Sequence, residues 1–467
     1  MGNIKRILIL VIIVLFLVAN GTTSISHHIN DFDKGVSQID SNEIIEIKTN
    51  SQNNILIQFI KDRLLSINGW MEKDKIFSLD GLDGDQFGYS VSIDGNYAII
   101  GAPYTDVNGD DSGSAYIFTR TGKSWSQQAK LIPSDGEKGD WFGWSVSING
   151  DYTIIGSILD DSVNGIDSGS AYIFKRSGAT WSQQAKIIPS DGEEGDFFGQ
   201  SVSINGGYAV IGAYHNDDNG LASGSAYIFN RLGNNWLQQE KLLPSDGTFG
   251  KWFGYSVSIY EDHAIIGAPF DEENGRMSGS AYIFNRLGDN WFQQAKLLPS
   301  DGAKYDEFGV SVSINGDYSI IGGYLNDDNG DASGSAYIFT RTGTTWSQQA
   351  KLLPSDGAEG NWFGLSVSIN GEFVIIGAKD DINGENSGSA YIFTRTGTTW
   401  SQQAKLLPSD GAEGNWFGWS VSINGLYAII GAYGDDLNGE YSGSAYIFRK
   451  SGENHPLNEF FKQCNIN

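Results

Sequence analysis

The sequence predicts an all-β fold: a seven-bladed β-propeller of four-stranded antiparallel blades, with the ring closed by an N-terminal strand near Trp70. Three observations lead to this prediction. One unit recurs seven times at intervals of 54–56 residues, and each unit contains four strand-like runs. The last unit lacks its fourth run, and a spare copy of that run precedes the first unit. A fixed period of this length is typical of propellers and solenoids.

Two motifs mark the unit: Phe-Gly, and Ser-Gly-Ser-Ala-Tyr-Ile-Phe further on. In the first unit, turn residues separate the four runs, which are A (Tyr89–Ile93), B (Tyr97–Ala102), C (Ser114–Thr119) and D (Trp125–Ile132). Run C is apolar on both alternating faces, as expected of a strand that neighbouring blades cover on both sides. Run A alternates serine with valine or isoleucine, and the small serines fit an innermost strand near a crowded axis.

The number of runs predicts how the ring closes. Runs A, B and C each occur seven times, and the last unit stops after Phe448. The spare run D, Trp70–Phe77, is expected to pair beside the strand that ends at Phe448, which removes the open edge of the ring. The tryptophan that begins each run D is interpreted as packing between blades. The glutamines that follow it are interpreted as a solvated outer edge.

Composition excludes several classes of protein. With 40% hydrophobic and 13% aromatic residues, the chain is not a disordered acidic protein. A formal net charge of −26 argues against a nucleic-acid partner, because phosphate binding needs clustered lysine and arginine. Cys464 is the single cysteine, so neither an internal disulfide framework nor a cysteine-based metal site is expected.

The chain ends predict export. Residues 1–21 combine Lys5 and Arg6 with 13 apolar residues, Ile7–Ala19, and small residues at a cleavage position. This segment is a signal peptide, or alternatively a retained N-terminal anchor, which would then be the chain's only contact with a membrane. The sequence therefore predicts a secreted or cell-surface protein. Residues 22–69 are interpreted as an irregular linker, 70–452 as the propeller, and 453–467 as a polar tail.

The repeated Phe-Gly and the Gly-Ala-Pro at 101–103 and 267–269 resemble FG-GAP repeats, like those of the integrin α-subunit β-propeller. The units are similar to the short form found in exported prokaryotic proteins. This resemblance implies a propeller at the cell surface that takes part in adhesion and protein binding. Integrin-type repeats carry a calcium loop between the first two strands. Here that link is a short turn, as at Ile148–Asp151, so those calcium residues cannot be transferred.

In antiparallel blades the B–C and D–A links share one face of the disc, and the A–B and C–D links share the other. The B–C links are acidic, which leaves three interpretations open: solvated turns, calcium ligands, or contact with a cationic partner. The candidate calcium ligands are Asp106, Asp110, Asp160, Asp161, Asp217, Asp218, Asp327, Asp328, Asp380, Asp381, Asp435 and Asp436. The C–D links on the opposite face carry an arginine in six of the seven units.

The D–A links bring an aromatic residue to the position before Phe-Gly in five units: Trp141, Phe197, Trp252, Trp362 and Trp416. These side chains either wedge between blades as core or bind a ligand, by stacking on sugars or anchoring a protein. No catalytic motif is present, and the two histidines of the repeats, His215 and His263, belong to no recognisable triad.

We therefore expect a non-enzymatic recognition and adhesion module that binds an extracellular protein or matrix partner through the B–C and D–A face. The alternative is a multivalent carbohydrate-binding propeller. No cofactor is expected to be required, and calcium is a candidate ligand.

Overall fold

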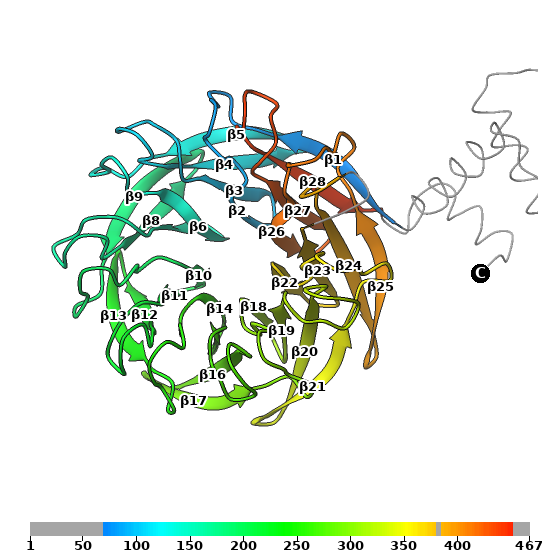
Figure 1. Cartoon of the computed structure of the whole chain (residues 1–467). Helices are drawn as coiled ribbons and strands as arrows, with labels where there is room; N and C mark the ends of the chain where they lie inside the picture. Colours follow the sequence, from blue (N-terminus) through cyan, green and yellow to red (C-terminus); the bar gives the residue numbers. More distant parts are fainter. Residues whose placement is uncertain (1–68, 380–383, 452–467) are drawn as a thin grey trace, which may run out of the picture. The chain divides into compact units, whose positions relative to one another are not determined.

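The computed structural model describes residues 69–379 and 384–451. In these ranges the chain forms 28 β-strands in seven four-stranded antiparallel sheets. The sheets surround a central axis as blades (Figure 1), and residues Gly69–Lys450 form one compact unit. None of the described residues lies in a helix with the length and apolarity needed to span a bilayer. The predicted signal or anchor segment and the polar tail lie outside the described residues.

Each blade places its run A strand next to the axis and its run B strand beside it (Figure 1). The innermost strands are β2 (Ser90–Asp94), β6 (Phe142–Asn149), β10 (Val202–Asn205), β14 (Ser256–Tyr260), β18 (Ser311–Asn315), β22 (Val367–Asn370) and β26 (Phe417–Asn424). The second strands are β3 (Tyr97–Ala102), β7 (Tyr152–Ser157), β11 (Tyr208–Ala213), β15 (His263–Ala268), β19 (Tyr318–Gly323), β23 (Phe373–Ala378) and β27 (Tyr427–Ala432).

Run C forms the third strand and run D the outermost one. The third strands are β4 (Ser114–Thr121), β8 (Ser170–Ser177), β12 (Ser225–Leu232), β16 (Ser280–Leu287), β20 (Ser335–Thr342), β24 (Ser389–Thr396) and β28 (Ser444–Lys450). The outermost strands are β5 (Ser124–Leu131), β9 (Thr180–Ile187), β13 (Asn235–Leu242), β17 (Asn290–Leu297), β21 (Thr345–Leu352), β25 (Thr399–Leu406) and β1 (Trp70–Ile76). We number the blades 1 to 7 from β2.

The ring closes as the sequence predicts. β1 completes blade 7 by pairing antiparallel with β28, and Glu72 lies opposite Phe448. The Trp70 side chain packs against Phe373 of blade 6, with 5.8 Å between ring centroids. The first described strand and the last therefore share one sheet, and the ring of blades has no open end.

The hydrophobic core lies between blades rather than within a single sheet. One cluster joins Ile154 and Ile173 of blade 2 to Phe198, Ile211 and Phe229 of blade 3. The third strands are buried along their first five residues, which agrees with the two-sided apolar pattern of run C. Each blade thus buries its apolar surface against its neighbours, so the blades stabilise one another.

The serines of the innermost strands also form hydrogen bonds between neighbouring blades. The Ile148 N–H of blade 2 donates to the Ser92 hydroxyl of blade 1 over 3.2 Å. The same bond recurs at every blade junction, including Ile93 to Ser422 across the closure. These bonds join the inner strands of different sheets to one another.

The outermost strands are also linked, so the prediction that their glutamines form a merely solvated edge was wrong. The Trp181 indole N–H donates to the Gln128 side chain of the preceding blade over 3.0 Å. The Gln183 side chain accepts the Ser134 N–H over 2.9 Å. The repeated Gln-Gln pair therefore connects adjacent blades, and the tryptophan packs between blades as expected.

Phe-Gly lies at the inner blade junction. Gly143 has φ 99°, and a β-carbon there would collide with the backbone oxygen of Ser114 in the preceding blade. The Phe142 N–H donates to the Ser112 oxygen over 3.2 Å. Glycine follows the phenylalanine because the backbones of two blades meet at this point, in a conformation that glycine adopts at little cost.

The face that carries the C–D links is held together by arginines. The Arg176 guanidinium of blade 2 lies 4.4 Å from the centre of the Tyr97 ring of blade 1 and pairs with Asp151. Similar arginine–tyrosine contacts recur at other junctions. These arginines therefore stabilise the ring.

Candidate functional site

The B–C loop of each blade packs against the D–A link of the next blade, so the two loop sets form one continuous face. The Gly139 N–H in the link to blade 2 donates to the backbone oxygen of Asp110 in blade 1 over 2.9 Å. The backbone N–H of Trp141 donates to the backbone oxygen of Asp111 over 3.2 Å. Backbone contacts thus fix the residues that this face displays.

The residue before Phe-Gly has a left-handed backbone in all seven blades, with φ between 51° and 56°. The residues are Gln86, Trp141, Phe197, Trp252, Glu307, Trp362 and Trp416. This conformation costs a bulky side chain about 1–2 kcal/mol, and such strain is concentrated at functional sites. A hydrogen bond such as Trp144 N–H to Trp141 O, 3.2 Å long, closes the turn.

The five aromatic residues among them lie among further aromatic residues, which stand one or two positions after Gly-Ala, or after Gly-Gly in blade 5. We call this set the aromatic girdle: Trp141, Phe197, Trp252, Trp362 and Trp416, with Tyr104, Tyr214, Phe270, Tyr324 and Tyr433 between them. Tyr214 shows the arrangement, because it stacks on Phe197 of its own blade and meets the edge of Trp252 in the next. The centroid distances are 5.6 Å and 5.2 Å. The girdle therefore crosses blade junctions.

In blade 6 a lysine takes the place of the intervening aromatic residue. The Lys379 ammonium lies 4.3 Å from the centre of the Trp362 ring and 5.9 Å from that of Trp416. Two rings of the girdle thus hold a cation that the chain itself supplies.

Inside the girdle, the residues after Phe-Gly surround the axis. We call them the axial ring: Tyr89, Trp144, Gln200, Tyr255, Val310, Leu365 and Trp419. They line the axial cavity, of about 260 Å³, together with the serines and valines that follow them. Tyr89 contacts Trp144 at 4.6 Å and Trp419 at 5.8 Å, which makes one side of the ring aromatic across the closure between blades 7 and 1.

The structure brings the five predicted aromatic residues together on one face. They are half-buried, packing against neighbours while part of each side chain stays open to solvent. Packing between blades and ligand contact are therefore compatible uses of the same rings. Sequence reasoning missed the axial ring and the residues after Gly-Ala. The available signal was that these positions differ among the seven copies, whereas the Ser-Val-Ser-Ile beside them is constant.

The acidic B–C residues mostly bind other groups of the protein. Asp160 is buried, accepts the Tyr172 hydroxyl over 2.6 Å and pairs with Lys186 at 2.9 Å. Asp435 is buried and accepts the Tyr446 hydroxyl. The following acid binds a backbone N–H five or six residues later in five blades: Asp106, Asp161, Asp217, Asp327 and Asp436.

Other candidate calcium ligands pair with lysines. Asp110 lies 2.7 Å from Lys138, Asp218 pairs with Lys241, and Asp328 pairs with Lys351. Asp380 and Asp381 lie outside the described residues. Across residues 69–379 and 384–451, no group of three or more His, Cys, Asp or Glu side chains could hold a metal ion. Calcium binding stays a prediction that the sequence made.

Another acidic residue, in the D–A link, lies beside the B–C loop. In blade 3 this residue is Asp196, whose carboxylate accepts a hydrogen bond from the Asn216 amide over 3.0 Å. In blade 2 both positions are acids, Asp140 and Asp160. Burial, together with the charge of Asp160, raises the pKa of Asp140 to about 7. Burial likewise raises the pKa of Asp85 to about 6. This site in blade 2 therefore takes up a proton near neutral pH.

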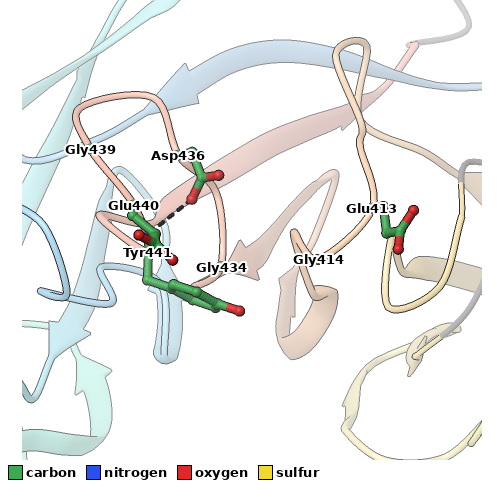
Figure 2. Close-up of a pocket in the computed structure, with 7 residues that line it drawn as sticks. All are labelled: Glu413, Gly414, Gly434, Asp436, Gly439, Glu440 and Tyr441. Atoms are coloured by element: carbon green, nitrogen blue, oxygen red, sulfur yellow. Dashed lines mark hydrogen bonds between the residues drawn. The ribbon is translucent and has the colours of Figure 1, made fainter.

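The face also holds an acidic pocket of about 400 Å³ in blade 7 (Figure 2). Gly434 lies at the position that Tyr104 and Phe270 fill in other blades, and a β-carbon there would collide with the backbone oxygen of Gly414. The lining residues are Glu413, Gly414, Gly434, Asp436, Gly439, Glu440 and Tyr441. The Asp436 carboxylate accepts the Tyr441 N–H over 2.8 Å (Figure 2), which orders the loop that carries the exposed tyrosine ring.

Comparison with known proteins agrees with this architecture. The family model described as the FG-GAP repeat matches seven segments: 70–118, 125–174, 181–229, 236–284, 291–339, 346–393 and 400–448. Each segment begins with an outermost strand and ends within the third strand of the next blade in the chain. A search of curated proteins found no match. With seven matched repeats in seven blades, the chain belongs to the FG-GAP repeat family of β-propellers.

Proposed function

We propose that this protein is a non-enzymatic recognition module that binds an extracellular protein or matrix partner through the aromatic girdle and the axial ring. The FG-GAP propeller fold is consistent with a protein-interaction module. A secreted or cell-surface location follows from the signal-like residues 1–21, in which case the partner is met outside the cell.

One observation carries the proposal, namely where the seven copies differ. The framework motifs recur in every blade, and their polar groups bind neighbouring blades. The positions before and after Phe-Gly vary between aromatic, aliphatic and polar side chains, and all of them lie on one face. A constant framework that displays variable residues on one surface is the arrangement expected of a binding site.

The residue types fit protein recognition. Tryptophan and tyrosine dominate the energetics of protein interfaces, because a large rigid ring buries much surface with little loss of conformational freedom. The left-handed backbone and the contacts between rings hold the girdle in place before a ligand arrives. Such preorganisation lowers the entropic cost of binding.

The proposal is tested by removing the rings without disturbing the backbone. Gln86 occupies the girdle position of blade 1 with φ 53°, so glutamine is compatible with this conformation. The test variant combines Trp141→Gln, Trp252→Gln and Trp416→Gln. The control is Phe292→Ser, which removes a 53% exposed ring from an outermost strand where four other blades have serine.

Wild type and variants are compared on arrays of extracellular proteins and of glycans, and each hit is measured by titration. We expect each ligand to bind the wild type and Phe292→Ser equally well. The same ligand should bind the triple variant at least tenfold more weakly. Equal binding by the triple variant, with an unchanged thermal melt, would contradict the proposal.

Carbohydrate binding is the second candidate. The half-exposed rings favour it, since sugar rings stack on aromatic faces, and so does the adjoining acidic pocket, since carboxylates accept hydroxyl hydrogen bonds. On the glycan array, Trp362→Ala should then abolish retention. A complete lack of glycan hits at high protein concentration would remove this candidate.

A further inference from the structure

The B–C loop of each blade meets the D–A link of the next blade at one repeated backbone hydrogen bond. The Gly139 N–H, for example, donates to the backbone oxygen of Asp110. We call the accepting residue and the residue that precedes the donor a junction pair, so Asp110 and Lys138 form the pair between blades 1 and 2. The same bond defines the other pairs: Ile166 and Glu194, Leu221 and Phe249, Arg276 and Lys304, Asp331 and Glu359, Glu385 and Glu413, and Glu440 and Asp83.

The junction pairs differ in charge around the ring. The pair between blades 1 and 2 is a salt bridge, with 2.7 Å between the Asp110 carboxylate and the Lys138 ammonium. At three consecutive junctions, from blade 5 through the closure to blade 1, both members are acids. We call these residues the acidic arc: Asp331, Glu359, Glu385, Glu413, Glu440 and Asp83. All six are exposed, and their carboxylates form no hydrogen bond or ion pair within the described part of the chain.

Each pair of the acidic arc holds two like charges close together. The Asp83 carboxylate lies against the loop that carries Glu440, because a β-carbon added to Gly439 would lie 1.8 Å from its oxygen. A β-carbon added to Gly384 would lie 3.4 Å from a Glu413 carboxylate oxygen. Like charges repel, and three such pairs in succession concentrate negative potential on this part of the face. A cationic ligand would remove the repulsion.

The acidic pocket of blade 7 lies between two pairs of the arc. Glu413 belongs to one pair and Glu440 to the next, and both line this pocket of about 400 Å³ (Figure 2). The exposed ring of Tyr441 lines it as well. Such a space accommodates the side chain of a lysine or arginine, whose alkyl part packs on the ring while its charge meets the carboxylates.

The chain itself shows which chemistry this face accepts. The Lys138 ammonium pairs with an acid at the equivalent junction of blades 1 and 2, and the Lys379 ammonium lies over the Trp362 and Trp416 rings. A metal ion fits less well. Calcium needs six to eight oxygen ligands, and the described residues contain no group of three or more His, Cys, Asp or Glu side chains that could hold a metal. Separate acid pairs therefore suit separate ammonium or guanidinium groups.

We propose that the acidic arc binds a basic segment of a partner protein, whose lysine or arginine side chains neutralise successive junction pairs and enter the pocket of blade 7. This inference rests on the proposed function, because the arc belongs to the same face, and it adds the charge of the partner. One segment that follows three consecutive junctions contacts several acids at once, so individually weak contacts combine into stable binding.

The test is a calorimetric titration of the full chain with hexalysine, using hexa-acetyllysine as the uncharged reference. Saturable binding is expected only for hexalysine. The arc variant combines Glu385→Gln, Glu413→Gln and Glu440→Gln, and should bind at least tenfold more weakly. The control combines Glu137→Gln, Glu193→Gln and Glu272→Gln, which removes as many exposed acids from the same face outside the arc and should bind like the wild type.

A second variant, Asp83→Lys, places a lysine where blade 2 has Lys138. It should pair with Glu440 as Lys138 pairs with Asp110, and should therefore raise the melting temperature while weakening hexalysine binding. The inference is overturned if the wild type shows no saturable binding, if a folded arc variant binds equally well, or if the arc and control variants weaken binding equally. If an array ligand depends on the girdle while hexalysine does not bind, the proposed function stands and this inference falls.

Discussion

The Trp181 indole N–H of blade 2 donates a 3.0 Å hydrogen bond to Gln128 of blade 1, and five further outermost strands repeat this relationship. Trp125 is the exception, since its buried indole nitrogen has no hydrogen-bond partner. The strand before it in the ring is β1, which carries Lys73 where the other outermost strands carry the accepting glutamine.

We therefore expect Lys73→Gln to stabilise the propeller. The glutamine supplies the missing acceptor, and the change also removes an ammonium whose pKa burial and the charges of Arg449 and Lys123 lower. One satisfied buried N–H corresponds to about 1 kcal/mol of unfolding free energy. Denaturant unfolding of wild type and variant measures the gain.

The mirror substitution, Gln128→Lys, provides the matched comparison. It creates at blade 2 the defect that wild type has at blade 1, and should lower stability by about 1 kcal/mol. Gains or losses of the same sign in both variants would contradict the explanation.

Closure of the ring predicts that Trp70 contributes as much to stability as the tryptophan of another outermost strand. Trp70 is buried between blades 6 and 7 and donates to Gln403, as Trp236 is buried between blades 2 and 3 and donates to Gln184. Each change to alanine should therefore cost about 3–5 kcal/mol. Thermal and denaturant unfolding compare the two, and a nearly neutral Trp70→Ala would show that β1 does not hold the ring closed in solution.

The fold could be predicted from the sequence because it depends on motifs that recur in every unit. The Phe-Gly spacing, the two-sided apolar run C and the displaced run at Trp70 each appear as a pattern along the chain. The pairing of β1 with β28 follows from the number of runs alone.

Two features of the structure, one at the outer edge of the blades and one in the candidate site, could not be predicted in this way. The partner of Gln128 is Trp181, 53 residues later, so its role depends on how neighbouring blades stack rather than on local alternation. The axial residues Tyr89 and Trp144 differ from their counterparts in other units, and a search for recurring residues passes over them. Their contact at 4.6 Å arises only when the ring brings neighbouring blades together.

The acid pair of blade 2 gives stability a dependence on pH. Asp140 has a pKa of about 7 in the folded protein, against an ordinary value of 3.8. Between these values the folded state binds the proton and the unfolded state does not. The stability that this group contributes is therefore present below pH 4 and is lost as the pH rises to 7.

Asp140→Asn should remove this loss, because Asn415 occupies the same position in blade 7 and binds Asp435. At pH 8 we expect the variant to be more stable by on the order of 1–2 kcal/mol, and near pH 4 little changed. Thermal melts across this range measure the difference. The exposed Asp331→Asn is the charge-matched control, and a gain at pH 8 no greater than that of the control would refute the assignment.

Metal removal should leave the melting temperature unchanged. Candidate calcium ligands in the described part of the chain already bind other groups: Asp160 binds Lys186 and the Tyr172 hydroxyl, and Asp161 binds a backbone N–H. A calcium ion would have to displace these partners before it could collect six or more oxygens. Melts with excess EDTA and with calcium chloride at matched ionic strength should therefore coincide. A rise of several degrees in calcium would instead show that the acidic loops rearrange around the ion, and Asp161→Asn should then abolish that rise.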